Sequence, residues 1–123
     1  MNIKCGTDII EIKRIKDDIE KLGEKFLNRI YTKKEIEYCE SKKSQKYQSY
    51  AVRFAAKEAI YKAISSQLEN KHSIEWKNME ILNDNNGRPV IQIHNSNLKI
   101  DTIDVSLSHC KEYAIATVIV IFN

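Results

Sequence analysis

The sequence predicts an α+β fold, with a mainly antiparallel sheet packed against a long central helix and several shorter helices. Three observations support this prediction: a β-branched segment opens the chain, helical periodicity dominates its middle, and strand-like segments separated by turn residues close it. A chain of 123 residues has the usual size of one domain, so we expect a single domain over residues 1–123.

The first part of the chain predicts one strand followed by two short helices. Residues 3–12 are rich in β-branched side chains but include Gly6, which predicts a strand whose register shifts near Thr7-Asp8. Between Ile15 and Leu27 apolar residues recur at helical spacing, and Gly23 interrupts them, so we expect a break between two helices there.

Two further helices are predicted in the middle of the chain. Thr32 followed by Glu35 is a capping-box signature, which indicates a helix that ends at about Cys39. The strongest helical segment runs from about Ser44 to Leu68, where helix formers and small residues predominate. We expect this segment to be the central helix of the fold.

The remaining residues alternate between strand-like segments and turns. The run Asn83–Gly87 ends in an Asn-Gly pair, which is a strong signal for a tight hairpin turn. We expect strands on both sides of it, then a turn or short helix, then a closing hairpin around Cys110–Glu112, over residues 79–82, 90–94, 95–99, 102–109 and 113–122.

The composition is that of an ordinary globular protein, with 42% apolar and 30% charged residues. No apolar segment reaches the roughly 18 residues that a membrane-spanning helix needs, so we expect no membrane partner. The first residues lack the features of a secretory signal, which favours a cytoplasmic location. A formal net charge of +3 favours anionic partners, but Lys and Glu are interspersed, unlike the basic stripe of a typical nucleic-acid-binding protein.

The three cysteines predict neither a disulfide framework nor a zinc site. Cys5, Cys39 and Cys110 are odd in number and lack metal-type spacing, so we interpret them as free thiols. A nucleophilic Cys110 beside His109 is a weaker alternative, because adjacent residues on a strand point to opposite faces of the sheet.

A group of charges in the predicted central helix is the first candidate site. Glu58 and Lys62 share a helix face one turn apart, among alanines that would let a ligand or another backbone approach. An exposed ion pair with ordinary packing explains the same pattern. Magnesium that binds substrate phosphates uses one or two protein carboxylates, and Asp8 with Glu58 is a candidate pair. Asp8 also fits a residue that satisfies the backbone at a strand irregularity.

Four motifs occur in the same order as in one known family. They are Gly6–Ile12 with Arg14-Ile15, Arg53–Ala59 with Lys62-Ala63, Asn86–Pro89, and Ser106–His109 with Tyr113–Ala116. Together they extend over nearly the whole chain, which resembles the holo-acyl-carrier-protein synthases, the short single-unit type of 4'-phosphopantetheinyl transferase. The resemblance implies the 4'-phosphopantetheinyl transferase fold. It also implies a magnesium-dependent enzyme of fatty acid biosynthesis that transfers 4'-phosphopantetheine from coenzyme A to a serine of apo-acyl carrier protein and releases 3',5'-ADP.

The resemblance implies a role for each matching residue. Asp8 and Glu58 are expected to bind Mg²⁺ and, with Lys62, to form the catalytic group. Arg14 is expected to contact the acyl carrier protein. The residues expected to bind coenzyme A are Arg53, Lys62, Gly87, Pro89 and His109. Without the resemblance, His109 would be interpreted as a partly buried histidine, and Gly87 and Pro89 as turn residues.

One segment departs from the family, and several details stay open. Where the family commonly has a Gly-Thr-Gly-like turn, this chain has Ser65-Ser66-Gln67-Leu68, so the end of the helix and its ligand contacts are not specified. Either Glu58 or a magnesium-bound water could accept the proton of the serine hydroxyl. The sequence also leaves open which carrier protein is preferred and whether acyl-coenzyme A is accepted.

The short chain implies an assembly. Related transferases of about twice this length resemble two such units in one chain with the site between them, so the resemblance implies a homo-oligomer, a trimer. Asp8, Glu58 and Lys62 of one subunit would then face the Gly87–Pro89 turn or His109 of a neighbour. A closed ring would also cover exposed strand edges.

Two other functional classes fit less well. A non-catalytic module that binds coenzyme A or carrier protein would be expected to lose Asp8, Glu58 or Lys62, and all three are present. A nucleic-acid-binding module is disfavoured by the mixed charge pattern.

Overall fold

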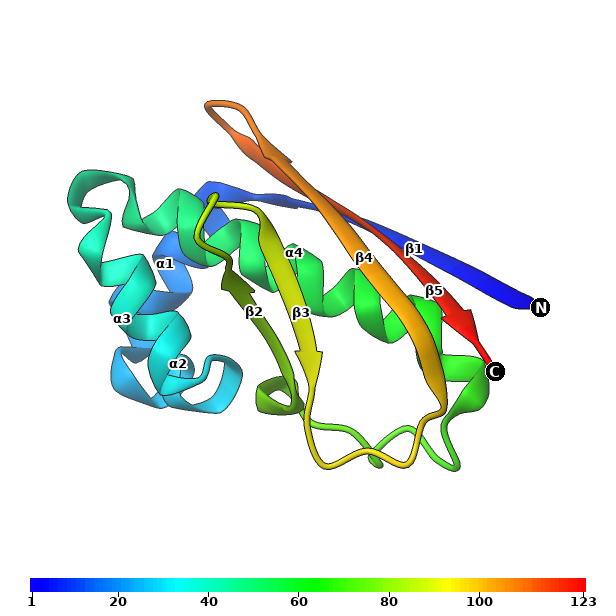
Figure 1. Cartoon of the computed structure of the whole chain (residues 1–123). Coiled ribbons are helices and arrows are strands. Elements are labelled where there is room, and N and C mark those ends of the chain that lie inside the picture. Colours follow the sequence, from blue (N-terminus) through cyan, green and yellow to red (C-terminus); the bar gives the residue numbers. More distant parts are fainter.

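The computed structural model describes the whole chain, from Met1 to Asn123, and shows a long helix lying behind two sheets (Figure 1). The helices are α1 (Ile12–Leu22), α2 (Glu24–Ile30), α3 (Lys33–Ser41) and α4 (Lys46–Ile64), with short 3₁₀ helices η1 (Lys43–Gln45), η2 (Ser65–Gln67) and η3 (Trp76–Asn78). The strands are β1 (Asn2–Glu11), β2 (Met79–Asn83), β3 (Pro89–Ile93), β4 (Ile100–His109) and β5 (Tyr113–Phe122).

All strand pairings are antiparallel, and they form two separate sheets. Strands β1, β5 and β4, in that order, form a three-stranded sheet, while β2 pairs only with β3. Helix α4 packs along β1 and β5, and α1, α2 and α3 gather at one end of it (Figure 1). The predicted α+β class, with a mainly antiparallel sheet against a long central helix, is confirmed.

The first strand is straighter than predicted. The register of β1 against β5 runs without a shift from Asn2 opposite Phe122 to Glu11 opposite Tyr113, so the predicted irregularity at Thr7-Asp8 is wrong. The irregular register lies instead in β4, between Ile100 and Thr102. Gly6 is needed for a different reason.

Gly6 allows β1 to lie directly against α4. A Cβ atom at this position would stand 2.0 Å from the backbone oxygen of Ala59 and 3.1 Å from the backbone nitrogen of Ala63. On α4, four fully or nearly fully buried residues have side chains small enough for close packing: Ala55, Ala56, Ala59 and Ala63. Core packing therefore explains the run of small residues in α4.

Local sequence signals are confirmed at most helix ends. Thr32 and Glu35 form the predicted capping box at the start of α3, with Thr32 N donating to Glu35 Oε1 at 2.8 Å and Glu35 N donating to Thr32 Oγ1 at 3.2 Å. Gly23 separates α1 from α2 at a φ of 61°. Helix α1, however, begins at Ile12 rather than Ile15, because Ile12 already packs into the core.

The later connections are turns. Residues 95–99 contain no helix, and Asn95 adopts a φ of 53°. Helix α4 ends at Ile64 and tightens into η2, so the helical region stops just before Leu68. No helix in the structure is both long enough and apolar enough to cross a membrane.

Candidate active site

Asp8 and Lys62 meet where β1 crosses α4. Alternation along β1 places Gly6, Asp8 and Ile10 on the side that faces the helix. Lys62 Nζ donates to Asp8 Oδ1 at 3.2 Å and to the backbone oxygen of Thr7 at 3.0 Å. The side chain of Asp8 is 19% exposed and that of Lys62 is 54% exposed, so the carboxylate is held in place while the ammonium group remains accessible.

Glu58 completes this group from the preceding turn of α4. Its side chain is half-buried, and this burial raises the pKa of Glu58. The negative charge of Asp8 raises that pKa further, whereas Lys62 and Arg14 lower it. Lys62 pairs with Asp8 rather than with Glu58, so the spacing of Glu58 and Lys62 does not reflect a simple i,i+4 ion pair.

The carboxylates of Asp8 and Glu58 suit a cation that takes its remaining ligands from a bound substrate and water. No group of three or more His, Cys, Asp or Glu side chains lies together as a self-sufficient metal site. Asp8 and Glu58, however, are two carboxylates close enough for the charge of one to raise the pKa of the other. Magnesium at phosphate sites needs only one or two carboxylates and takes its other oxygens from phosphate and water. The two residues therefore fit the metal that the sequence predicts.

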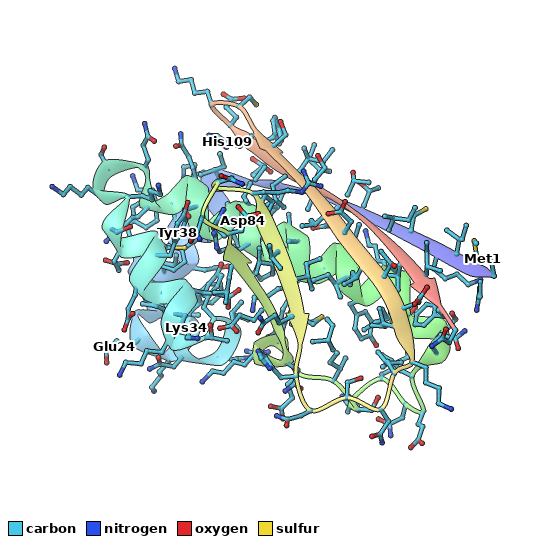
Figure 2. The ribbon with its side chains drawn as sticks, viewed as in Figure 1. Met1, Glu24, Lys34, Tyr38, Asp84 and His109 are labelled. Atoms are coloured by element: carbon cyan, nitrogen blue, oxygen red, sulfur yellow. The ribbon has the colours of Figure 1, made fainter.

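Four other predicted residues line a separate cleft of about 710 Å³. Arg53, Gly87, Pro89 and His109 reach it from α4, the β2–β3 connection, β3 and β4 respectively. Figure 2 shows His109 near the end of the β4–β5 hairpin, with the β2–β3 turn marked by Asp84 lying between it and α3. The structure thus brings four distant segments together around one cavity.

The cleft is rich in cations. Arg53 is only 3% exposed, donates to Ser49 Oγ at 3.0 Å and to Asn83 Oδ1 at 2.6 Å, and keeps one buried nitrogen, Nε, without a partner. Its guanidinium carbon lies 4.3 Å from the centre of the Tyr38 ring, and the Lys42 ammonium lies 4.8 Å from the same ring centre. Two cations, Arg53 and Lys42, therefore lie against the Tyr38 ring in one wall of the cleft.

Arg88 also lines the cleft, where it is paired with a carboxylate. Its Nη2 donates to both carboxylate oxygens of Asp104, at 3.0 Å and 2.9 Å. Tyr38, Lys42 and Asp104 were not predicted as site residues. Nothing in their local sequence indicates a site, because only the tertiary fold brings α3 and β4 next to the hairpin turn.

The two groups of predicted residues do not share a pocket within the chain. Glu58 lines a different cavity of about 670 Å³, together with Arg29, His72 and Trp76. The structure therefore joins Asp8, Glu58 and Lys62 in one place and the remaining coenzyme A candidates in another.

No helix or strand covers the sheet face opposite α4 (Figure 1). This face is also largely apolar. Large side chains that alternate outward along β1 and β5 are 39–61% exposed: Ile3, Ile9, Tyr113, Ile115 and Ile119. Thr117 and Ile119, which stand on this face, also line the cleft. The cleft consequently opens beside the uncovered face.

Arg14 lies on the exposed side of α1. Lys13 donates to Asp17 at 2.8 Å in an exposed i,i+4 pair, so part of this surface is an ordinary charged helix face. The positive charge of Arg14 also lowers the pKa of Glu58, which brings α1 into electrostatic contact with the Asp8 group.

Comparisons with known proteins agree with these observations. The profile of the 4'-phosphopantetheinyl transferase superfamily matches residues 4–118. The holo-[acyl-carrier-protein] synthase of Ruminiclostridium cellulolyticum is 44% identical over 126 positions, covering 98% of this chain and 92% of that protein. The one from Chloroherpeton thalassium is 42% identical, covering 96% and 97%.

A solved structure shows the same fold. The holo-[acyl-carrier-protein] synthase of Helicobacter pylori, in complex with coenzyme A, matches with a TM-score of 0.83 at 30% identity, covering 95% of this chain and 99% of that one. Family profile, sequence relatives and architecture agree along almost the whole chain. The chain therefore belongs to the 4'-phosphopantetheinyl transferase superfamily and, within it, to the holo-acyl-carrier-protein synthases.

Proposed function

We propose that this chain transfers 4'-phosphopantetheine from coenzyme A to a serine hydroxyl of apo-acyl carrier protein and releases 3',5'-ADP. The observation that carries the proposal is the meeting of Asp8, Glu58 and Lys62 at the crossing of β1 and α4, two carboxylates and an accessible ammonium group in one place. The names of the relatives and the coenzyme A complex of the H. pylori enzyme support it.

Asp8 and Glu58 would hold Mg²⁺, which when bound supplies positive charge against the phosphoryl oxygens. Lys62 is more than half exposed and is free to turn from Asp8 toward a phosphate. The serine oxygen attacks the β-phosphorus of coenzyme A, the bond from that phosphorus to the bridging oxygen breaks, and 3',5'-ADP leaves with this oxygen. Glu58, the half-buried carboxylate of this group, would accept the serine proton.

The cleft lined by Arg53, Gly87, Pro89 and His109 would bind the nucleotide part of coenzyme A. Its cations suit phosphate groups, and the unpartnered Nε of Arg53 is a buried donor that an anionic ligand could satisfy. Gly87 adopts a φ of 80° in the turn, with no atom within 4 Å of the place where a Cβ would be, so a ligand can approach its backbone.

The functional unit would be a homotrimer. Within one protomer the Asp8 group and the coenzyme A cleft are separate, and the cleft opens beside an uncovered apolar face. Such a face marks an interaction surface. A neighbour that packs on it would bring its own Asp8, Glu58 and Lys62 to the cleft, and a closed ring would repeat this contact for every protomer.

Arg14 and its basic neighbours on α1 would receive the carrier protein. The carrier is expected to be acidic, so complementary charge would steer its serine toward the adjacent Asp8 group. We place the reaction in the cytoplasm, a reducing compartment in which the three free thiols, buried Cys39 and exposed Cys5 and Cys110, would persist.

Intact-mass analysis tests this function. The chain, coenzyme A, Mg²⁺ and an apo-acyl carrier protein are expected to give a carrier that has gained one phosphopantetheine group, while a carrier with alanine in place of the acceptor serine gains none. Binding of coenzyme A without any mass gain would support a non-catalytic binding module instead.

A further inference from the structure

Lys57 and Glu35 form an ion pair that is completely enclosed by the protein. Both side chains are 0% exposed, and Lys57 Nζ lies 2.8 Å from Glu35 Oε1. Lys57 directly precedes Glu58 in α4, but it points away from the Asp8 group, toward α3 and β2. None of the proposed catalytic roles uses it.

Each side-chain nitrogen and oxygen atom of this pair has a hydrogen-bond partner within the protein. Lys57 Nζ uses its three donors on Glu35 Oε1, on the backbone oxygen of Trp76 at 3.0 Å and on the backbone oxygen of Met79 at 2.7 Å. Glu35 Oε2 accepts from the backbone nitrogen of Ile81 at 2.9 Å. The pair therefore ties the first residues of β2 to both α3 and α4, and it offers nothing to a ligand.

Stability alone does not account for such a pair. Removing two charges from water is costly, and well-packed apolar replacements of a buried ion pair are often neutral or stabilising. The pair lies within the protein core, where the Lys57 ammonium stands 5.7 Å from the centre of the buried Tyr31 ring. What the pair supplies that an apolar pair would not is a fixed hydrogen-bonded position for β2.

That position matters because β2 and β3 belong to no larger sheet. The hairpin pairs only with itself, so no strand ladder fixes its place relative to the three-stranded sheet. A second attachment exists at its other end, where Arg53 Nη2 donates to Asn83 Oδ1 at 2.6 Å. Arg53 and Lys57 are one turn apart on α4, and Met79 and Asn83 are the two ends of β2, so the strand is fastened at both ends to the central helix.

We propose that Lys57 and Glu35 are positioning residues, whose enclosed pair holds the β2–β3 hairpin, and with it the Gly87–Pro89 wall of the cleft, at a fixed place relative to α4. This inference rests on the proposed function only in assigning coenzyme A to that cleft. It predicts that loss of the pair weakens coenzyme A binding without removing any group that touches the reacting atoms.

The decisive variant removes both charges together. Single variants Lys57→Met and Glu35→Leu each leave one buried charge unpaired, and both are expected to be strongly destabilised. The double variant Glu35→Leu/Lys57→Met leaves no buried charge unpaired, so it should recover part of the thermal stability lost in either single variant. Its dissociation constant for coenzyme A should nevertheless rise by about tenfold to a hundredfold, because small displacements of binding groups have effects of this size, while kcat at saturating coenzyme A stays within about threefold.

A matched control separates positioning from general destabilisation. Val120→Ala removes volume from a fully buried site in β5, away from the hairpin, and should lower thermal stability without changing coenzyme A affinity. Hydrogen exchange should be faster at the amides of residues 79–93 in the double variant but not in Val120→Ala. Wild-type coenzyme A affinity and unchanged exchange in the folded double variant would overturn the proposal.

Two further outcomes are informative. If the double variant does not fold, Glu35→Asp replaces it, since the shorter side chain keeps the charge opposite Lys57 while moving the carboxylate back from the backbone nitrogen of Ile81. Faster exchange confined to the hairpin would support the proposal, and unchanged exchange would overturn it. If the wild-type protein neither binds coenzyme A nor modifies a carrier, the proposed function fails, yet the exchange experiment still decides whether the pair positions the hairpin.

Discussion

Gly6→Ala is the sharpest test of how the fold builds the Asp8 group. The added methyl carbon would lie 2.0 Å from the backbone oxygen of Ala59, a distance that Cβ atoms in real proteins do not show. The atoms that it would meet belong to the backbone of α4 and cannot rotate away, so β1 and α4 must separate locally by about 1 Å. Asp8 is two residues further along the same face of β1, and its 3.2 Å contact with Lys62 crosses this same interface.

The expected loss has two parts. Overpacking of this kind costs about 1–3 kcal/mol of the free energy of unfolding, measured by urea denaturation. A displacement of about 1 Å at a catalytic group lowers kcat by about a hundredfold, measured by transfer to the carrier at saturating coenzyme A. Gly23→Ala is the matched control, because it strains a φ of 61° with no atom within 4 Å and should cost stability alone. A Gly6→Ala enzyme with kcat within twofold of the wild type would refute this reasoning.

Four other predictions follow from the site and its surroundings. Asp8→Asn and Glu58→Gln should each lower transfer by at least about a hundredfold with unchanged circular dichroism, and excess chelator should mimic them; near-normal turnover would mean that the metal pair is misassigned. Arg14→Glu should raise the apparent KM for carrier protein, leave coenzyme A affinity unchanged and weaken the salt dependence of the rate; a collapse of coenzyme A affinity would place Arg14 in the nucleotide site instead. Ile119→Lys should give an inactive monomer by light scattering, whereas an active monomer would exclude the trimer. Glu80 is a buried carboxylate in β2 that is hydrogen-bonded to Thr32 and His94. Burial raises the pKa of Glu80, but these two hydrogen bonds lower it more, so the stabilisation is present above pH 4.5 and is lost as the pH falls through the lower folded-state pKa. In Glu80→Gln the free energy of unfolding should depend less on pH below 4.5 than in the wild type. An unchanged acid dependence would contradict this.

Sequence patterns predicted the features that depend on neighbouring residues. The capping box of Thr32 and Glu35, the break at Gly23 and the turn that ends at Gly87 each rest on contacts within a few residues, and the structure confirms all three. Gly6 was misinterpreted as a sign of a strand irregularity because its actual requirement is a contact with Ala59, more than fifty residues away. The residues around Gly6 in the sequence do not predict that contact.

The same distinction separates the predicted site residues from those that were missed. Asp8, Glu58 and Lys62 were identified through motifs, and the structure brings them together at one crossing. Lys57 lies inside the same motif, but its enclosure depends on Glu35 in another helix, and no spacing rule links the two. Tyr38 was missed for a similar reason, since its role in the cleft exists only once α3 has packed beside α4.

Helix α4 is largely buried, yet its charged side chains all find partners or solvent. A helix that is buried on nearly all sides carries four charged residues between Arg53 and Lys62, and each of them needs a partner or an opening to water. Arg53 and Lys57, one turn apart, both donate hydrogen bonds to β2, and Lys57 also donates to α3. Glu58 and Lys62, also one turn apart, face β1, where Asp8 and solvent receive them. The two pairs point to different sides because adjacent residues on a helix diverge by about 100°. One helix can therefore hold the cleft wall with one face and present the proposed catalytic group with the next, and a shift of its register would disturb both.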